Sequence, residues 1–210
     1  MIKNSVALMA LSIFAFLATH SSLHAEIIFL NPTGAAGAGL LGGNISPPPS
    51  QSGTGGVGPT GVFFDTVTNI LHVDVHWGSG NGFTDLTSTV EMLHLHGPTE
   101  DQAPGNFGQQ GPLIINLGQS ATFNNSPVNG GVNDNFFLSN QEAEWLLNNQ
   151  TYINVHTTVN LTSGEIRGYL VAVPEPNSVW IIAMLGVACI GFVGLRRDRS
   201  RPIMQKVLSK

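Results

Sequence analysis

Polar and apolar residues alternate in two stretches of the segment 152–170, YINVHTTVNLTSGEIRGYL. Side chains of a strand point alternately to its two faces, so this segment predicts two strands, 152–157 and 165–170, joined by a turn. Each strand has one apolar face, which we expect to join a core, and one polar face. The polar faces carry Tyr152, Asn154 and His156 on the first strand and Glu165, Arg167 and Tyr169 on the second.

Similar patterns predict further strands before this hairpin. The expected segments are 26–30, 62–64, 70–77, part of 86–96, and 112–117. One helix is expected over 139–148, because Ser139 is followed three residues later by Glu142 in the capping-box arrangement. The polar segment 124–134 is expected to be a loop. These elements predict an all-β domain with one short helix.

Glycine and proline set the expected domain boundaries. Residues 31–61 contain ten glycines and five prolines, a composition that interrupts helices and central strands. We therefore expect residues 26–61 to form an N-terminal arm, irregular over 31–61, laid over a core domain of residues 62–172.

Charge is sparse and unevenly distributed. Only 10% of residues are charged, and between Glu26 and Ala172 eleven acidic residues accompany a single basic one, Arg167. A domain this acidic lacks the basic stripe that follows a phosphate backbone, so nucleic acid is excluded as a partner. The only cysteine, Cys189, lies in an apolar run, so no disulfide or cysteine-based metal site is available to the domain.

Both ends of the chain have the features of targeting segments. Residues 1–25, with Lys3 before an apolar stretch, predict a secretory signal peptide; a retained N-terminal anchor is the alternative. Residues 179–195 are apolar and uncharged, and as a helix they would span about 26 Å, enough to cross a membrane. A cluster of arginines follows, which places the tail 196–210 in the cytoplasm: Arg196, Arg197, Arg199 and Arg201. A buried core helix is the alternative for 179–195.

Histidines supply the candidate chemistry. His94 and His96 fall on one face of a predicted strand together with Met92, about 7 Å apart along it. With His156 on a neighbouring strand, they would complete a three-histidine site for zinc or copper. The alternative is structural, with these histidines hydrogen-bonded to Glu165, Asn154 and loop backbone. His72, Asp74 and His76 also share a strand face, which suits either a metal or a solvated surface.

Arg167 is expected to form a structural ion pair. Its five N–H donors suit a carboxylate, and the candidate partners are Glu165, Glu91 and Asp74, with Glu165 preferred because it shares the predicted strand face.

The central part of the chain resembles the CHRD family, which occurs in chordin and in exported bacterial proteins. The resemblance starts near Leu41, ends at Leu170, and rests on NISPPP (44–49), SGTGGVG (52–58), FFDTVTNILHVDVHW (63–77), LHLHGP (93–98), GPLIINL (111–117), NVHT (154–157) and GEIRG (164–168). It implies an antiparallel β-sandwich-like domain without an established enzymatic activity.

The C-terminus resembles a PEP-CTERM sorting signal, in which a short motif precedes an apolar helix and an arginine cluster. Here the motif is Pro174-Glu175-Pro176 within the spacer 173–178. The resemblance implies export across the inner membrane of a Gram-negative bacterium, processing by an exosortase-type enzyme, and an association with exopolysaccharide at the cell surface.

Together these features predict a non-catalytic module of the bacterial surface or its extracellular matrix, held first in the inner membrane and then sorted. No cofactor is required for that function. The alternative is a small zinc or copper protein that uses His94, His96 and His156 and is redox-active.

Overall fold

The computed structural model describes residues 26–100, 103 and 107–174. The chain divides into two compact units, 1–172 and 173–210. Every described strand, the described helix and the apolar core belong to the first unit.

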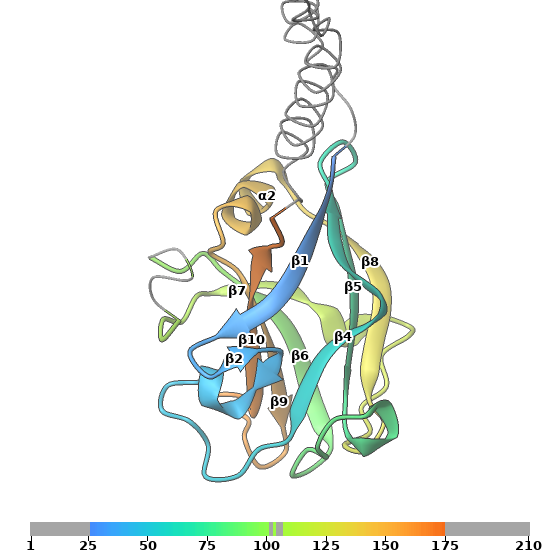
Figure 1. Ribbon diagram of the computed structural model, residues 1–210, viewed down its shortest axis with the longest axis vertical. Coiled ribbons are helices and arrows are strands. Elements are labelled where there is room, and N and C mark those ends of the chain that lie inside the picture. The colour runs from blue at the N-terminus through green and yellow to red at the C-terminus, as the bar shows by residue number, and fades with distance from the viewer. Residues whose placement is uncertain (1–25, 101–102, 104–106, 175–210) are drawn as a thin grey trace, which may run out of the picture. The chain divides into compact units, whose positions relative to one another are not determined.

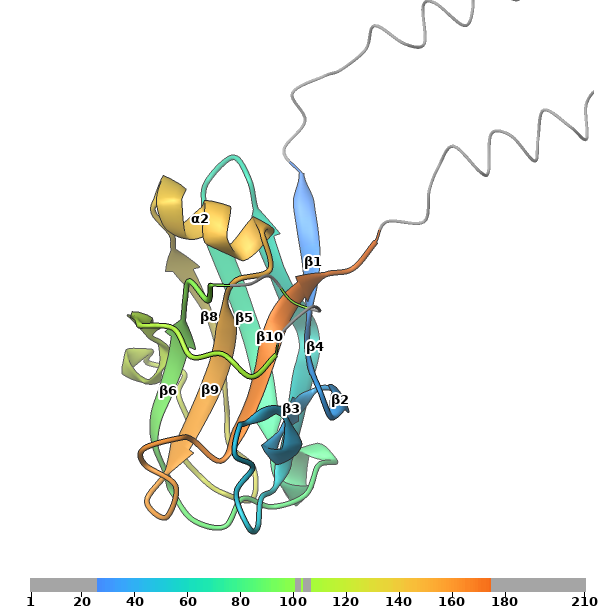
Figure 2. The ribbon, with the colours of Figure 1, turned by 90° about the vertical axis from the view of Figure 1, so that its left-hand side faces the viewer.

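Ten strands of the described residues form one hydrogen-bonded antiparallel sheet, which folds over on itself into two layers (Figure 1; Figure 2). One layer consists of β4 (Thr54–Asp65), β5 (Ile70–Trp77) and β8 (Gly131–Phe137). The other consists of β10 (Ile166–Ala172), β9 (Tyr152–Thr157), β6 (Val90–His96) and β7 (Leu113–Asn116). The expected antiparallel, all-β, sandwich-like architecture is confirmed.

The first strand, β1 (Ile27–Gly34), joins the two layers along one side. Its residues 27–30 pair with β4, and its residues 30–33 pair with β10. Two very short strands continue this side, β2 (Gly37–Ala38) and β3 (Leu40–Leu41), and β3 pairs with both β10 and β4. Neither layer is therefore left with an unpaired edge on this side of the domain.

The strand expected at 26–30 is confirmed as part of β1, whereas the irregular stretch expected over 31–61 is wrong for both of its ends. Residues 27–34 and 54–61 are integral strands, and β4 pairs with β5 on both sides of an irregularity between Val57 and Val62. Pro59 lies within that irregularity, where a missing N–H removes no ladder hydrogen bond. Glycine and proline therefore mark a bulge inside a long strand here. They do not mark a segment without a strand.

The polar loop expected over 124–134 is also partly wrong. Residues 131–137 form β8, which pairs along its whole length with β5. Asn133 and Asn135 lie opposite Asp74 and His72 on the side of the sheet that faces away from the core, so β8 lacks the apolar run by which a strand is recognised in a sequence.

The short helix is confirmed as α2 (Asn140–Leu147). The Ser139 side chain accepts a hydrogen bond from the Glu142 backbone, and the Glu142 carboxylate accepts one from the Ser139 backbone N–H at 2.8 Å. Ala143 and Leu146 attach this helix to the core. Three short 3-10 helices complete the described elements: η1 (Gly42–Asn44), η2 (Ser79–Asn81) and η3 (Leu117–Gln119).

The core fills the space between the two layers. It consists of the apolar faces that alternation predicts, including Leu71, Val73, Val75 and Trp77 of β5, Leu93 and Leu95 of β6, and Ile153 and Val155 of β9. Burial of these side chains fixes the register of each strand, because a slip of one residue would exchange its apolar and polar faces. The opposite faces of β6 and β9 are thereby turned outward, and they carry the histidines.

Among the described residues, no helix is both long enough and apolar enough to cross a membrane. The expected signal peptide (1–25), membrane helix (179–195) and basic tail (196–210) lie outside the described residues, as do Glu175, Pro176 and the four arginines of the tail.

Candidate metal centre

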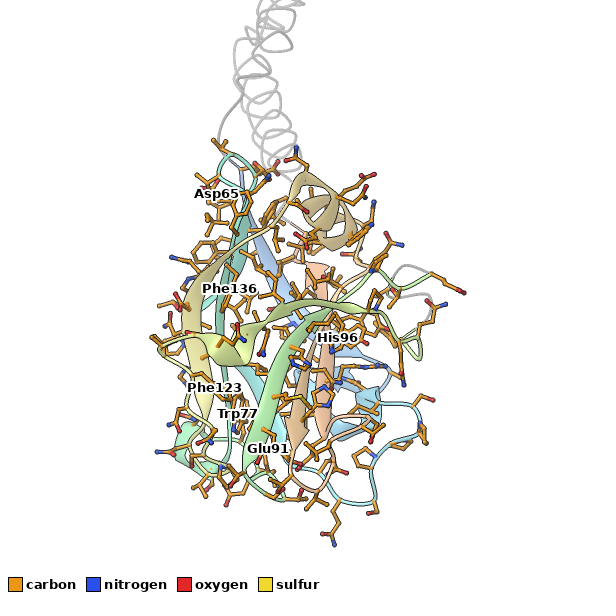
Figure 3. The ribbon with its side chains drawn as sticks, turned by 180° about the vertical axis from the view of Figure 1, so that it is seen from behind. Asp65, Trp77, Glu91, His96, Phe123 and Phe136 are labelled. Carbon is orange, nitrogen blue, oxygen red and sulfur yellow. The ribbon has the colours of Figure 1, made fainter. Side chains whose placement is uncertain are left out.

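Three histidines meet on the outer face of two neighbouring strands. His94 and His96 alternate on β6 with the core residues Leu93 and Leu95, while β9 carries His156. Antiparallel pairing places His94 opposite Asn154 and His96 opposite Tyr152; His156 lies two residues beyond Asn154 on β9, and its ring lies close to those of both His94 and His96. Figure 3 shows His96 on β6 in a view from behind the molecule.

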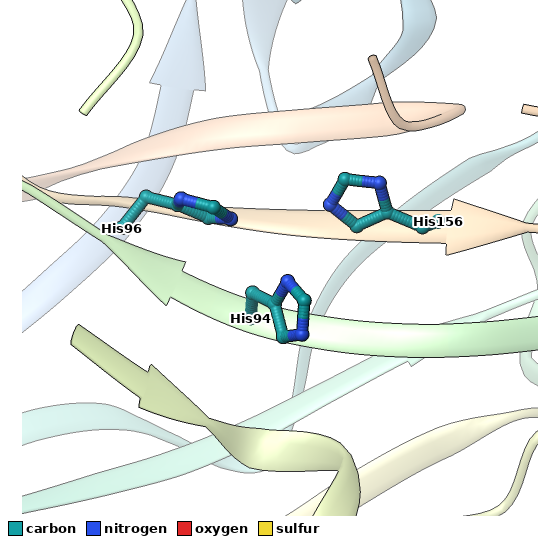
Figure 4. Close-up of side chains that lie close together, drawn as sticks. All are labelled: His94, His96 and His156. Carbon is teal, nitrogen blue, oxygen red and sulfur yellow. The ribbon is translucent and has the colours of Figure 1, made fainter. Parts of the chain in front are cut away.

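The three imidazoles lie close enough to share an ion. Their ring centroids are 5.3 Å apart for His94 and His96, 5.2 Å for His94 and His156, and 6.1 Å for His96 and His156. One ligand nitrogen from each residue can be chosen so that all three lie within 4.8 Å of one another (Figure 4). The structure thus brings together the three residues that the sequence singled out as one group.

Backbone carbonyls orient two of the rings. His96 Nδ1 lies 3.0 Å from the carbonyl oxygen of Gly111, and His156 Nδ1 lies 2.8 Å from that of Leu161. A carbonyl oxygen only accepts hydrogen bonds, so each Nδ1 carries the proton and each Nε2 keeps its lone pair. Donation of one ring N–H to a carbonyl while the other nitrogen faces the metal is the usual arrangement of ligating histidines.

The two Nε2 atoms differ in what they contact. His96 Nε2 is buried and has no hydrogen-bond partner among the described residues. His156 Nε2 lies 3.1 Å from Nδ2 of Asn154, whose amide also donates to the carbonyl oxygen of Ser163. A metal would supply the missing partner of His96 and would displace the Asn154 amide from His156.

Burial keeps all three histidines neutral. Desolvation, followed by the proximity of His156 and His96, lowers the pKa of His94 from 6.5 to about 4. Desolvation likewise lowers the pKa of His96 and of His156, although their hydrogen bonds to backbone carbonyls act in the opposite direction. Neutral imidazole is the form that binds metals, so protons do not compete for these ligands near neutral pH.

Arg167 of β10 lies beside this cluster, at the end of a stack of rings. The His96 ring stacks on Tyr152, and the guanidinium lies 4.6 Å from the centre of the Tyr152 ring and 5.4 Å from that of Tyr169. Its N–H groups donate to three backbone carbonyls: Asn44 at 3.1 Å, Gln109 at 3.2 Å and Phe107 at 2.7 Å. This cation is 2% exposed, and neutral groups satisfy it.

The expected ion pair between Glu165 and Arg167 is therefore wrong. Glu165 precedes the first residue of β10, and its carboxylate accepts hydrogen bonds from two backbone N–H groups, Gly53 at 3.0 Å and Thr87 at 2.8 Å. The hydroxyls of Thr157 and Thr87 also donate to it. Burial acts to raise the pKa of Glu165, but these hydrogen bonds outweigh it, and the pKa lies below its usual value. Among the described residues, Glu165 thus joins three segments of the chain without pairing with a cation, and none of its hydrogen bonds is to a histidine.

The second group on a strand face, His72, Asp74 and His76, is engaged in a separate network. Asp74 accepts hydrogen bonds from Thr60 at 2.7 and 2.8 Å and lies 2.8 Å from His76 Nε2, the one salt bridge found among the described residues. Thr60 also contacts His72. These contacts hold the bulge of β4 against β5, and the sequence did not place Thr60 in this group.

Other contributors to the histidine site were not recognised from the sequence. The carbonyls of Gly111 and Leu161 come from loops, and a backbone carbonyl has no signature in a sequence. Tyr152 was placed on the correct face by its alternation with Asn154 and His156, but its stacking on His96 depends on the register between β6 and β9.

Comparison with known families supports the resemblance seen in the sequence. The family model of the CHRD domain matches residues 36–170. The chain belongs to the CHRD family. The matched region includes all three histidines as well as Arg167, and it begins a few residues earlier than the motifs alone suggest. No curated protein and no solved structure is detectably similar to this CHRD protein.

Proposed function

We propose that this CHRD domain is a metal-binding module in which His94, His96 and His156 hold one zinc or copper ion. The observation that carries the proposal is the convergence of three neutral imidazoles, with ligand atoms within 4.8 Å of one another, on two paired strands. A rigid sheet supplies such a site at a low entropic cost, because its strands already fix the positions of the three residues.

The residues fit a metal ion with a small adjustment. Zinc–nitrogen distances of about 2.0–2.1 Å place the nitrogens of a tetrahedral site roughly 3.3 Å apart. The ligand nitrogens, which lie within 4.8 Å of one another, therefore need to approach by up to about 1.5 Å, which side-chain rotation can supply. The buried Nε2 of His96, which lacks a partner among the described residues, would gain one. When bound, the ion would link β6 to β9 and stabilise the folded state.

The wider role is that of a non-catalytic module exported to the surface or the extracellular matrix of a Gram-negative bacterium. Its support is the sequence of the two ends: the signal-peptide pattern of 1–25, the Pro174-Glu175-Pro176 motif and the apolar run 179–195. In this proposal an exosortase-type enzyme processes the inner-membrane form, and exopolysaccharide or another surface component is the partner. A redox-active copper form is the alternative.

Metal analysis of the domain tests the binding proposal. Residues 26–172 would be purified, stripped with a chelator, re-equilibrated with zinc or copper, and analysed for bound metal by mass spectrometry and for melting temperature. We expect one ion per chain and a higher melting temperature. His94→Ala and His156→Ala should lose both, whereas the matched control His72→Ala should keep both. A folded domain that takes up neither metal and melts at an unchanged temperature would refute metal binding.

Mass spectrometry of the mature protein from the native membrane tests the sorting proposal. Processing predicts a C-terminus upstream of the apolar run 179–195. If every mature chain ends at Lys210, transpeptidase processing is wrong and the segment is a plain membrane anchor.

A further inference from the structure

A fourth side chain with metal-binding chemistry shares the outer face of β6 and β9 with the three histidines. Met92 precedes His94 by two residues on β6, so both point to the same face, and pairing places Met92 directly opposite His156. Directly opposed residues of an antiparallel pair have Cβ atoms about 4.5–5.5 Å apart. A half-buried methionine, with three rotatable bonds, can bring its thioether to an ion held by its two neighbours.

The strand has an irregularity at this point. The register between β6 and β9 shifts between Val90 and Met92, so Glu91 is the extra residue. A bulge of this kind redirects side chains, and bulges are frequent next to functional sites. Val90 keeps its place in the core, while Met92 continues the outward series of His94 and His96. Without the bulge, Val90 and Met92, which are two residues apart, would point to the same face of the strand.

The charge of the surroundings selects among metals. All three histidines are neutral ligands, and no carboxylate joins their group among the described residues. The buried guanidinium of Arg167 lies behind Tyr152, whose ring stacks on His96 with the planes 5° apart. A divalent ion would be placed in a partly desolvated site with no anionic ligand and a buried cation nearby, which is unfavourable. A monovalent ion is penalised much less.

We infer that the centre is built for Cu(I), with the Met92 thioether as the fourth ligand beside His94, His96 and His156. This inference rests on the proposed metal site and names its ion. Thioether sulfur is a soft ligand that favours Cu(I), whereas zinc sites draw on imidazole, thiolate and carboxylate. The neutral ligand set and the position of Arg167 favour the same choice on electrostatic grounds, independently of sulfur.

The test is an anaerobic competition titration of the full chain in detergent. Cu(I) would be shared between the protein and a chromophoric Cu(I) chelator, and Zn(II) binding would be measured in parallel with a zinc indicator. X-ray absorption of the copper-loaded protein would report the ligand atoms. We expect Cu(I) to bind at least about tenfold more tightly than Zn(II), with a sulfur neighbour in addition to nitrogen.

Two variants at neighbouring positions separate the thioether from the bulge itself. Met92→Leu, which keeps the volume, should weaken Cu(I) binding about tenfold or more and leave Zn(II) binding unchanged. Glu91→Gln should leave both unchanged, and a loss of Cu(I) binding there would overturn the assignment to Met92. The wild-type absorption spectrum decides the question even if Met92→Leu does not fold.

The possible failures are distinguishable. If Zn(II) binds as tightly as Cu(I) and the copper spectrum lacks sulfur, the Cu(I) assignment is overturned and the three-histidine site stands. If the folded protein binds no metal at all, both the assignment and the site are overturned.

Discussion

The Tyr152 ring stacks on the His96 imidazole, with the ring centroids 5.1 Å apart and the planes inclined by only 5°. The Tyr152 hydroxyl accepts a hydrogen bond from the Gly111 backbone N–H at 3.1 Å, and the Gly111 carbonyl lies 3.0 Å from His96 Nδ1. Tyr152 therefore holds His96 in two ways, by direct contact with the ring and through the loop that fixes its tautomer.

Removal of this ring should weaken both the fold and the metal site. Tyr152→Leu removes the stack on His96 and the contact with the Arg167 guanidinium, and we expect it to lower the free energy of unfolding by roughly 2–4 kcal/mol. Tyr152→Phe is the matched control, since it keeps both ring contacts and loses only the hydroxyl, at a cost of about 1 kcal/mol. Urea denaturation of the metal-free domain measures both values. Equal losses in the two variants would contradict a role for the stacked ring.

Arg167 should behave as a buried cation that organises loops. Arg167→Met leaves the carbonyls of Asn44, Phe107 and Gln109 without this donor, and we expect a loss of about 3 kcal/mol or more, with a lower melting temperature. Arg167→Lys should recover only part of the lost stability, because a single ammonium cannot reproduce the planar guanidinium with its several N–H donors. A melting temperature equal to that of the wild type in Arg167→Met would refute this role.

Energetic coupling between Glu165 and Arg167 should be small, because the two side chains bond to different partners. In a double-mutant cycle of Glu165→Gln and Arg167→Met, the two losses of stability should add to within about 0.5 kcal/mol. A coupling of about 2 kcal/mol or more would restore the ion pair that the sequence suggested.

The lowered pKa of Glu165 makes its contribution to stability dependent on pH. Because the folded-state pKa lies below the unfolded value of 4.5, the contribution is present above pH 4.5 and is lost as the pH falls through the folded-state pKa. Glu165→Gln should lower the free energy of unfolding at neutral pH by roughly 1–3 kcal/mol and flatten its decline in acid. Denaturation at a series of pH values tests this, with the exposed Glu91→Gln as the control. An unchanged acid decline in Glu165→Gln would contradict the prediction.

The metal-free domain should also lose stability between pH 6.5 and about pH 4, because His94 takes up a proton more readily in the unfolded chain than in the folded domain. Its pKa is 6.5 when unfolded and about 4 when folded, so between these values the unfolded chain binds more protons and folding becomes less favourable as pH falls. The free energy of unfolding should drop by roughly 1–3 kcal/mol across this window. In His94→Gln the drop should be smaller. A wild-type domain that is equally stable at pH 6.5 and at about pH 4 would contradict this prediction.

The local patterns of the chain predicted much of the fold, because strand alternation and helix capping depend on residues that are close together in the sequence. Strict alternation located β5, β6, β9 and β10, since one face of each packs into the apolar core. The capping box located α2, because its hydrogen bonds join the side chains and backbones of Ser139 and Glu142, which lie only three residues apart in the sequence. The same reasoning failed for β8 and for the start of β4, where strand pairing comes from β5 and the residues themselves favour turns.

By itself, the sequence determined which face of each strand joins the apolar core, and hence that His94, His96 and Met92 share one face of β6 and that His156 shares its face with Tyr152 and Asn154. Only the tertiary structure decided that these two faces are the same outer face of one layer, because that depends on the pairing of β6 with β9. It also decided the partners of Glu165 and Arg167. A charged side chain bonds to whichever groups the fold brings within reach, and here those groups are amides, hydroxyls, carbonyls and aromatic rings from distant segments of the chain.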